Sequence, residues 1–174
     1  AARLARLTDN TLQLARLDAP GVQLACDWES AEDLAGSAIR RARQREPERA
    51  LHVRVEPGLP LLWCDAMLIS QLLDNLLHNA LKYSPTEAPV ELLVRRIDGQ
   101  VMLAVRDRGP GVSPAWRERV FHVFQRGPGA EAAAADAQVL RDRPGAGVGL
   151  AVCRAIARVH GGDLRVRARA HGGS

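Results

Sequence analysis

Scarce residue types narrow what this protein can be. Lys82 is the only lysine among 24 lysines and arginines, and aromatic residues make up 3% of the 174-residue chain. The net charge of +4 comes from arginines spread over the whole length, with no basic block interleaved with aromatics. Nucleic-acid binding normally needs such a basic patch, so we expect no nucleic-acid partner.

Cysteines and long apolar runs are scarce too. The three cysteines, Cys26, Cys64 and Cys153, are far apart and include no C-x-x-C pair. This spacing argues against a disulfide framework and against a thiolate zinc site. No apolar run approaches the roughly 20 residues that cross a bilayer, and no signal-peptide pattern is present. We therefore expect a soluble domain in the reducing cytoplasm.

The chain does contain an ordinary share of apolar residues, 47%, and enough length for one domain with a core. Residues 1–17 are predicted to form an amphipathic helix, because apolar residues recur there at spacings of three and four. The seam positions of this helix are Leu4, Leu7, Thr11 and Leu14. A single helix cannot bury such an apolar stripe by itself, so the stripe predicts that a partner helix packs against it. The alternative, that the helix packs on its own domain, stays open.

The remainder of the chain alternates between helical and strand patterns. Ser30 and Asp33 form a capping box, Asp65 is a good N-cap, and Pro85 ends the helix that Asp65 begins. Asp98-Gly99 predicts a hairpin turn between two strands. Helices are predicted over 31–45, 66–83, 114–121 and 148–160, and strands over 21–28, 51–55, 90–97, 100–106 and 164–168.

The helix over 66–83 carries a polar stripe. Asn75, Asn79 and Lys82 follow one another at spacings of four and three, so they share one face. Amide oxygens and one ammonium suit a hydrated magnesium ion that bridges phosphates, because magnesium takes few protein ligands. The alternative is a plain amphipathic helix with a solvated polar face. His78, beside Lys82, either tunes such a site or is solvated.

Two glycine-rich turns accompany this helix. The turn 107–111 follows a predicted strand, and its Asp107 can accept a hydrogen bond from an exocyclic amine such as that of adenine. The turn 145–150 opens a predicted helix, whose first N–H groups can bind an anion. The alternatives are an ordinary tight turn and a helix cap. Between the two turns lies a long unpatterned segment, 127–144, which predicts a mobile lid or a disordered loop. Arg126 at its entrance either folds over phosphate when the lid closes or is a solvated surface residue.

Taken in this order, the motifs resemble the ATP-binding catalytic domain of sensor histidine kinases, in the superfamily shared with gyrase and the heat-shock-90 chaperones. The run 75–83 is similar to the N box of that family, 107–111 to its G1 box, 121–124 to its F box and 145–150 to its G2 box. The resemblance implies a two-layer α/β sandwich with a mixed sheet on three helices, preceded by a helix from the dimerisation domain. Residues 1–20 would be the end of that helix with its linker, and 21–174 the ATP-binding domain.

The resemblance also implies a site for ATP and Mg²⁺. Asn79 would coordinate the metal, with Asn75 supporting the metal and phosphate site. The remaining site residues would be Lys82 and Arg126 at the phosphates, Tyr83 lining the nucleotide pocket, Asp107 at the adenine amine, Gly109 and Gly111 shaping that pocket, and Gly145, Gly147, Gly149 and Leu150 at the phosphate-side turn.

A histidine kinase of this kind transfers the γ-phosphoryl of ATP to a histidine on its dimerisation helix, and then to an aspartate of a response regulator. The implied partners are therefore the phosphoacceptor domain of the same protein and a response regulator. The five histidines of this sequence lie outside the phosphoacceptor context of the family: His52, His78, His122, His160 and His171. We therefore expect a monomeric fragment that binds ATP without autophosphorylating, from a homodimeric parent anchored in the bacterial inner membrane. The alternative is a non-catalytic nucleotide-sensing module or another ATPase of the superfamily.

A finer resemblance is to the Kdp-type potassium-responsive sensor kinases. It depends on the segments 21–24, Trp28, 36–38, 153–156 and 160–162. The sequence departs from the family pattern after Gly172, where a final strand would follow, so we expect the sheet to be one strand short.

Overall fold

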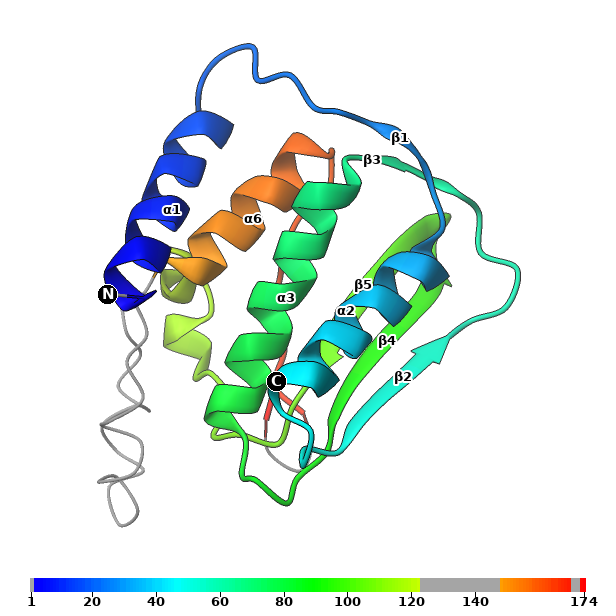
Figure 1. Cartoon of the computed structure of the whole chain (residues 1–174), viewed down its shortest axis with the longest axis vertical. Coiled ribbons are helices and arrows are strands. Elements are labelled where there is room, and N and C mark those ends of the chain that lie inside the picture. Colours follow the sequence, from blue (N-terminus) through cyan, green and yellow to red (C-terminus); the bar gives the residue numbers. More distant parts are fainter. Residues whose placement is uncertain (1, 123–147, 170–172) are drawn as a thin grey trace.

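A layer of three helices packs on a mixed three-stranded sheet in the computed structural model of the chain, which describes residues 2–122, 148–169 and 173–174 (Figure 1). The helices lie side by side in the order α6, α3, α2; the sheet lies behind α3 and α2, and α6 packs against α3. Their bounds are α2 Ala31–Arg45, α3 Ala66–Tyr83 and α6 Gly149–Val159, and the strands are β2 Leu51–Val55, β4 Val90–Ile97 and β5 Gln100–Arg106. The expected two-layer α/β sandwich is confirmed.

The sheet is mixed because β4 pairs differently with its two neighbours. It runs parallel to β2, with Leu51 opposite Val90, and antiparallel to β5, with Glu91 opposite Arg106. The turn between β4 and β5 contains Asp98 at φ 49° and Gly99 at φ 79°. Positive φ at both central residues belongs to the tight hairpin turns that Asp-Gly favours, so the predicted hairpin is confirmed.

The predicted caps begin the helices. The Ser30 hydroxyl accepts from the Asp33 N–H at 3.2 Å. The Asp65 carboxylate accepts from the N–H groups of Met67 and Leu68, both at 3.1 Å. Each cap satisfies donors that a helix start leaves without partners. Helix α3 therefore starts and ends where the sequence predicts.

The core lies between the helices and the sheet. Leu73 and Leu77 of α3 are fully buried, as are Leu92 of β4 and Ile156 of α6. Fully burying a side chain of this kind stabilises the fold by about 1.5–3 kcal/mol. The buried leucines of α3 point toward the sheet side, so its polar residues are left on the flanks of the helix.

A second, two-stranded sheet lies apart from the first. Strand β1 (Asp27–Glu29) pairs antiparallel with β3 (Leu62–Cys64), and Trp28 faces Trp63 with ring centroids 5.3 Å apart. The predicted strand over 21–28 is therefore wrong for residues 21–26. Its alternation does not bury one face, since Val22 is 36% exposed, and β3 offers a partner of only three residues.

Two further predictions need correction. Residues 164–168 form no strand, although Leu164 packs against the core. Residues 164–167 alternate between half-buried and exposed, as predicted, but the segment pairs with none of the described strands. The predicted helix over 114–121 is two short 3₁₀ turns, η1 (Pro114–Trp116) and η2 (Arg119–Phe121). The predicted lid, 127–144, lies outside the described residues.

The N-terminal helix α1 (Ala2–Leu17) packs beside α6 on the side away from α3 (Figure 1). Leu17 is buried and Leu14 is partly buried against the core, whereas the predicted seam residue Thr11 is exposed. For residues 8–17 the structure therefore matches the alternative that this helix packs on its own domain.

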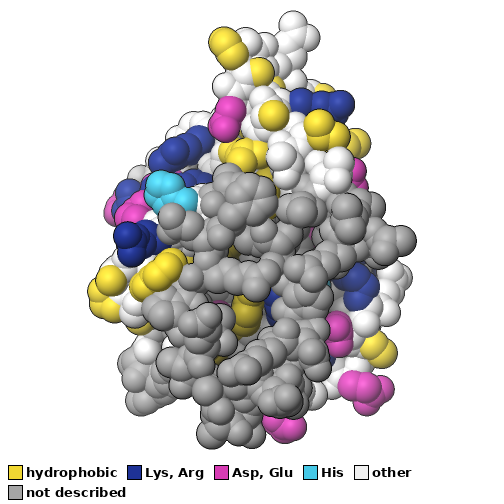
Figure 2. Space-filling model, turned by 90° about the vertical axis from the view of Figure 1, so that its left-hand side faces the viewer, with side chains coloured by type: hydrophobic (Ala, Val, Ile, Leu, Met, Phe, Trp, Pro, Cys, Tyr) yellow, Lys and Arg dark blue, Asp and Glu magenta, His cyan; other side chains and the backbone are white. Residues whose placement is uncertain are grey.

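The surface seen from the α1 side carries charges of both signs (Figure 2). Lys and Arg side chains alternate there with Asp and Glu, so the described residues on that face do not form one continuous basic patch.

Among the described residues, no helix combines the length and apolarity that a membrane crossing requires.

Candidate nucleotide-binding site

The C-terminal half of α3 presents the predicted polar stripe. Asn75, Asn79 and Lys82 are half-buried, and Tyr83 is 41% exposed. Lys82 Nζ donates to the Tyr83 hydroxyl at 3.2 Å and lies 4.7 Å from the centroid of the Tyr83 ring. The cation–π contact and the hydrogen bond hold the ammonium near the end of the helix. His78, one turn before Lys82, is exposed.

Asn75 lies at the junction between α3 and α6. Burial raises the pKa of the Cys153 thiol of α6 to about 12, and the neighbouring Asn75 amide opposes part of that rise. The thiol donates to the Leu72 carbonyl at 3.6 Å. Asn75 Nδ2 is buried and has no hydrogen-bond partner among the described residues. An amide left in this state is one that a ligand oxygen or a water would complete.

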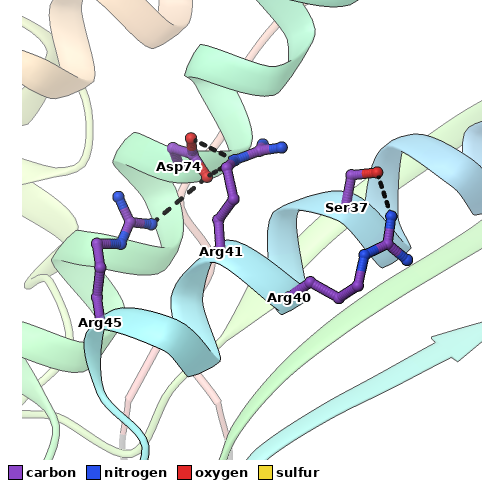
Figure 3. A network of polar contacts seen from close by, with 5 residues as sticks. All are labelled: Ser37, Arg40, Arg41, Arg45 and Asp74. Atoms are coloured by element: carbon purple, nitrogen blue, oxygen red, sulfur yellow. Dashed lines mark hydrogen bonds and ion pairs between the residues drawn. The ribbon is translucent and has the colours of Figure 1, made fainter.

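Asp74, the residue before Asn75, faces the opposite flank of α3. Its carboxylate accepts from Arg41 Nε at 3.0 and 3.2 Å and from Arg45 Nη2 at 3.5 Å, which ties α3 to α2 (Figure 3). On α2 itself, Arg40 donates to the Ser37 hydroxyl. Because Asp74 points to α2, the stripe that begins at Asn75 is turned toward α6.

The Asp107 carboxylate is buried, at 9% exposure, and accepts two short hydrogen bonds. The Gly109 N–H donates to its Oδ1 at 2.7 Å, and the Ser174 hydroxyl donates to its Oδ2 at 2.9 Å. No ion pair of Asp107 is found among the described residues. Asp107 is thus a buried acceptor whose second oxygen bonds a hydroxyl that another donor could replace.

The turn after Asp107 is pressed against the end of α3. A Cβ added to Gly109 would lie 2.7 Å from the Tyr83 carbonyl oxygen. The Ser84 hydroxyl, which is buried, accepts from the Arg108 N–H at 3.3 Å. These contacts place Tyr83 beside the Asp107 turn. Sequence analysis missed Ser84, although its position directly after the asparagine run was a usable signal.

Gly111, the other glycine of the turn 107–111, has φ 70°, and a Cβ added there would lie 3.1 Å from the Gly173 carbonyl oxygen. At the start of α6, Val148 is the N-cap residue and makes no side-chain cap bond, while Gly149 and Leu150 are half-buried. The first N–H groups of α6 therefore receive no capping oxygen from Val148. Arg126, Gly145 and Gly147 lie outside the described residues.

Metal ligation at this site would depend on amides. Among the described residues, no three His, Cys, Asp or Glu side chains come together as a metal cluster. Asn75 and Asn79 are neutral oxygen donors, which suits a hard cation that keeps waters and phosphate oxygens as its other ligands.

Two hollows of the described surface, one of about 490 Å³ between α1 and α6 and one beside Ser30, contain none of the predicted site residues.

The fold and this site define a nucleotide-binding domain of the ATPase class. Residues 64–174 match the histidine kinase-, DNA gyrase B- and HSP90-like ATPases, and the chain belongs to this family. The resemblance to the catalytic domain of sensor histidine kinases is confirmed by the relatives and structures that follow.

Sensor protein KdpD of Escherichia coli is 33% identical over 171 residues, which are 97% of this chain and 18% of KdpD. MprB of Mycolicibacterium paratuberculosis, a signal transduction histidine-protein kinase/phosphatase, is also 33% identical over 171 residues, which are 98% of this chain and 30% of MprB. Identity alone therefore does not separate a Kdp type from an MprB type. The chain spans less than a third of either relative.

Among solved structures, full-length ShkA in complex with AMPPNP has a TM-score of 0.80 and 29% identity, over 98% of this chain and 34% of ShkA. The similarity covers α1 as well as the sandwich, because it extends over nearly the whole chain.

We predict that Gly109→Ala lowers the free energy of unfolding by about 1–3 kcal/mol, because the new methyl group would overlap the Tyr83 carbonyl oxygen. The matched control is Gly36→Ala in α2, where the added Cβ meets only Arg40 Nη1 at 3.4 Å. That change should raise stability by about 0.5–1 kcal/mol, since alanine is the better helix residue. Urea denaturation of both variants measures the difference. Equal effects of the same sign would contradict the close approach at Gly109.

Proposed function

We propose that this chain binds Mg-ATP and serves as the catalytic domain of a sensor histidine kinase. The observation that carries the proposal is the contact between the end of α3 and the Asp107 turn, through Gly109 against the Tyr83 carbonyl and Ser84 against Arg108. This contact supports one common site for the polar stripe of α3, which would bind phosphate, and the buried acceptor Asp107. Such a pair fits the two ends of a nucleotide.

The base would lie at Asp107. A buried carboxylate oxygen that already accepts from the Ser174 hydroxyl can accept instead from the exocyclic amine of adenine. Gly109 and Gly111 would shape the pocket by letting the turn approach the end of α3 closely, and Tyr83 would line the edge of the ring. A base with a carbonyl at that position would place an acceptor against an acceptor, so the site would favour adenine.

The phosphates would lie along α3 and at the start of α6. Lys82 would contact them as a point charge, and the first N–H groups of α6, at Gly149 and Leu150, would add partial positive charge. Magnesium, when bound, would neutralise phosphate charge, with Asn79 holding it and Asn75 supporting the metal and phosphates. We extend the phosphate site to Arg126, Gly145 and Gly147 on the motif resemblance alone.

The reaction we propose is transfer of the γ-phosphoryl to a histidine on the phosphoacceptor domain of the same protein, and then to an aspartate of a response regulator. In phosphoryl transfer the protein mainly positions groups and neutralises charge. The α3 stripe and the α6 start perform that work here. The histidine and its base would come from the phosphoacceptor domain.

The family and its relatives support the wider assignment. We propose that residues 1–20 are the end of a dimerisation helix and its linker, and that residues 21–174 form the ATP-binding domain. By name, KdpD is a sensor protein and MprB is a signal transduction histidine-protein kinase/phosphatase. From the family resemblance we propose a homodimeric parent anchored in the bacterial inner membrane. We propose a Kdp-type parent on the motifs of the sequence together with the KdpD match.

Calorimetric titration of ATP with and without magnesium tests the site. We expect Asn79→Ala to weaken ATP binding about tenfold to a hundredfold in magnesium, because it removes a metal ligand worth as much as a hydrogen bond to a charged group. In EDTA the variant and the wild type should differ little. The control is Gln71→Ala, two turns earlier on the same helix, which should bind as the wild type does. Tight, metal-insensitive binding that Asn79→Ala leaves unchanged would exclude the role of Asn79.

Acid-labile phosphate tests the reaction. The chain alone should bind ATP without incorporating phosphate, and the chain preceded by its phosphoacceptor region should form acid-labile, base-stable phosphohistidine from γ-labelled ATP. Replacing the acceptor histidine by alanine in the longer protein is the control. If the longer protein binds ATP but no acid-labile phosphate forms, the reading as a nucleotide-sensing module replaces the kinase assignment.

A further inference from the structure

His160 joins the end of α6 to the start of α3. Its ring Nε2 lies 3.0 Å from the backbone nitrogen of Asp65, the residue that caps α3, and its Nδ1 lies 2.8 Å from the Ile156 carbonyl oxygen. The ring is half-buried. The motif His160-Gly161-Gly162 has no part in the nucleotide site described above, so these contacts call for their own explanation.

The two contacts determine which ring nitrogen of His160 carries the hydrogen. A backbone N–H can only donate, so Nε2 must be the acceptor from Asp65. A carbonyl oxygen can only accept, so Nδ1 must carry the hydrogen that it donates to Ile156. Only neutral imidazole protonated at Nδ1 satisfies both partners. A ring protonated at Nε2 would place a donor against the Asp65 N–H.

The Asp65 end of this link is itself firmly held. The Asp65 carboxylate accepts from Met67 and Leu68 at the helix start and from the Ala25 N–H at 3.1 Å. At the other end, Gly161 at φ 75° turns the chain out of α6, with its N–H on the Arg158 carbonyl. The ring therefore connects two well-defined helix termini.

Helices α3 and α6 lie antiparallel, side by side (Figure 1). Cys153, in the middle of α6, contacts Leu72, in the middle of α3, and His160 contacts Asp65 at the far end. Gly149, which opens α6, must then lie toward the half of α3 that carries Asn75 and Asn79. A slide of α6 along α3 by one residue would move Gly149 about 1.5 Å past the asparagines. Apolar packing between the two helices opposes such a slide, and the directional hydrogen bond between His160 and the Asp65 N–H adds to it by favouring a single register.

We propose that His160 is a positioning residue, whose neutral ring sets the register of α6 against α3 and so places the start of α6 opposite Asn75 and Asn79. The inference rests on the proposed nucleotide site and adds a residue to it that touches no substrate. His160 acts from the opposite end of α6, through the helix.

Nucleotide binding by ring variants tests the proposal. His160→Phe keeps the ring shape but removes both hydrogen bonds, and it should weaken Mg-ATP binding about twofold to tenfold, the worth of one ordinary hydrogen bond. His160→Gln can still place an acceptor against the Asp65 N–H and should restore most of the affinity. The matched control is His52→Phe, at an exposed position of β2, which should bind as the wild type does.

A direct measurement accompanies the variants. Nitrogen-15 NMR of the wild-type chain should show His160 with its proton on Nδ1, and a scalar coupling across the hydrogen bond between the Asp65 amide nitrogen and Nε2. This readout is independent of nucleotide and stays available if His160→Phe does not fold. A proton on Nε2, or no coupling, would overturn the proposal.

The binding results separate this inference from the proposed function. Loss of Mg-ATP binding in the wild type itself would contradict the proposed function. Normal binding by the wild type with unchanged binding by His160→Phe would overturn the positioning role alone. Equal weakening in His160→Phe and His160→Gln would also overturn it, because the retained acceptor would then have no effect.

Discussion

Helix α3 must bury one face against the sheet and each flank against a neighbouring helix, and the rest of the structure depends on this constraint. Leu73 and Leu77 are fully buried beneath it. Asp74 holds the α2 flank through Arg41 and Arg45, and Leu72 meets Cys153 on the α6 flank. With three sides occupied, the helix cannot rotate without exposing leucine or breaking an ion pair. The direction of Asn75, Asn79 and Lys82 is therefore set by packing, before any ligand binds.

The same constraint explains why glycine is required at Gly109. The end of α3 is fixed by its packing, so the Asp107 turn has to approach the Tyr83 carbonyl without a side chain in between. The Ser84 hydroxyl then satisfies the Arg108 N–H at the point of contact. The turn and the helix end thus form one unit, in which a buried carboxylate and a polar stripe keep a constant separation. Preorganisation of this kind lowers the cost of ordering groups when a ligand binds.

Local signals in the sequence predicted much of this arrangement. Ser30 and Asp65 began their helices as caps, and Asp98-Gly99 turned its hairpin, because each of these interactions lies within a few residues of its cause. The strand predictions failed for residues 21–26 and 164–168 because a strand needs a backbone partner, and alternation of side chains does not supply one. The hydrogen bonds of Cys153 to Leu72 and of Arg108 to Ser84 were missed for the same reason. They join residues far apart in the sequence, so the partner of each residue cannot be read from its neighbours in the chain.

The most direct test of the α3 site uses the fact that asparagines are few. The sequence contains only Asn10, Asn75 and Asn79, so selective labelling of asparagine gives three side-chain amide signals in NMR. On addition of a non-hydrolysable ATP analogue with magnesium, the signals of Asn75 and Asn79 should shift, while that of Asn10, buried on α1, should stay in place. Shifts confined to Asn10, or no shift at saturating nucleotide, would contradict a nucleotide site on this helix.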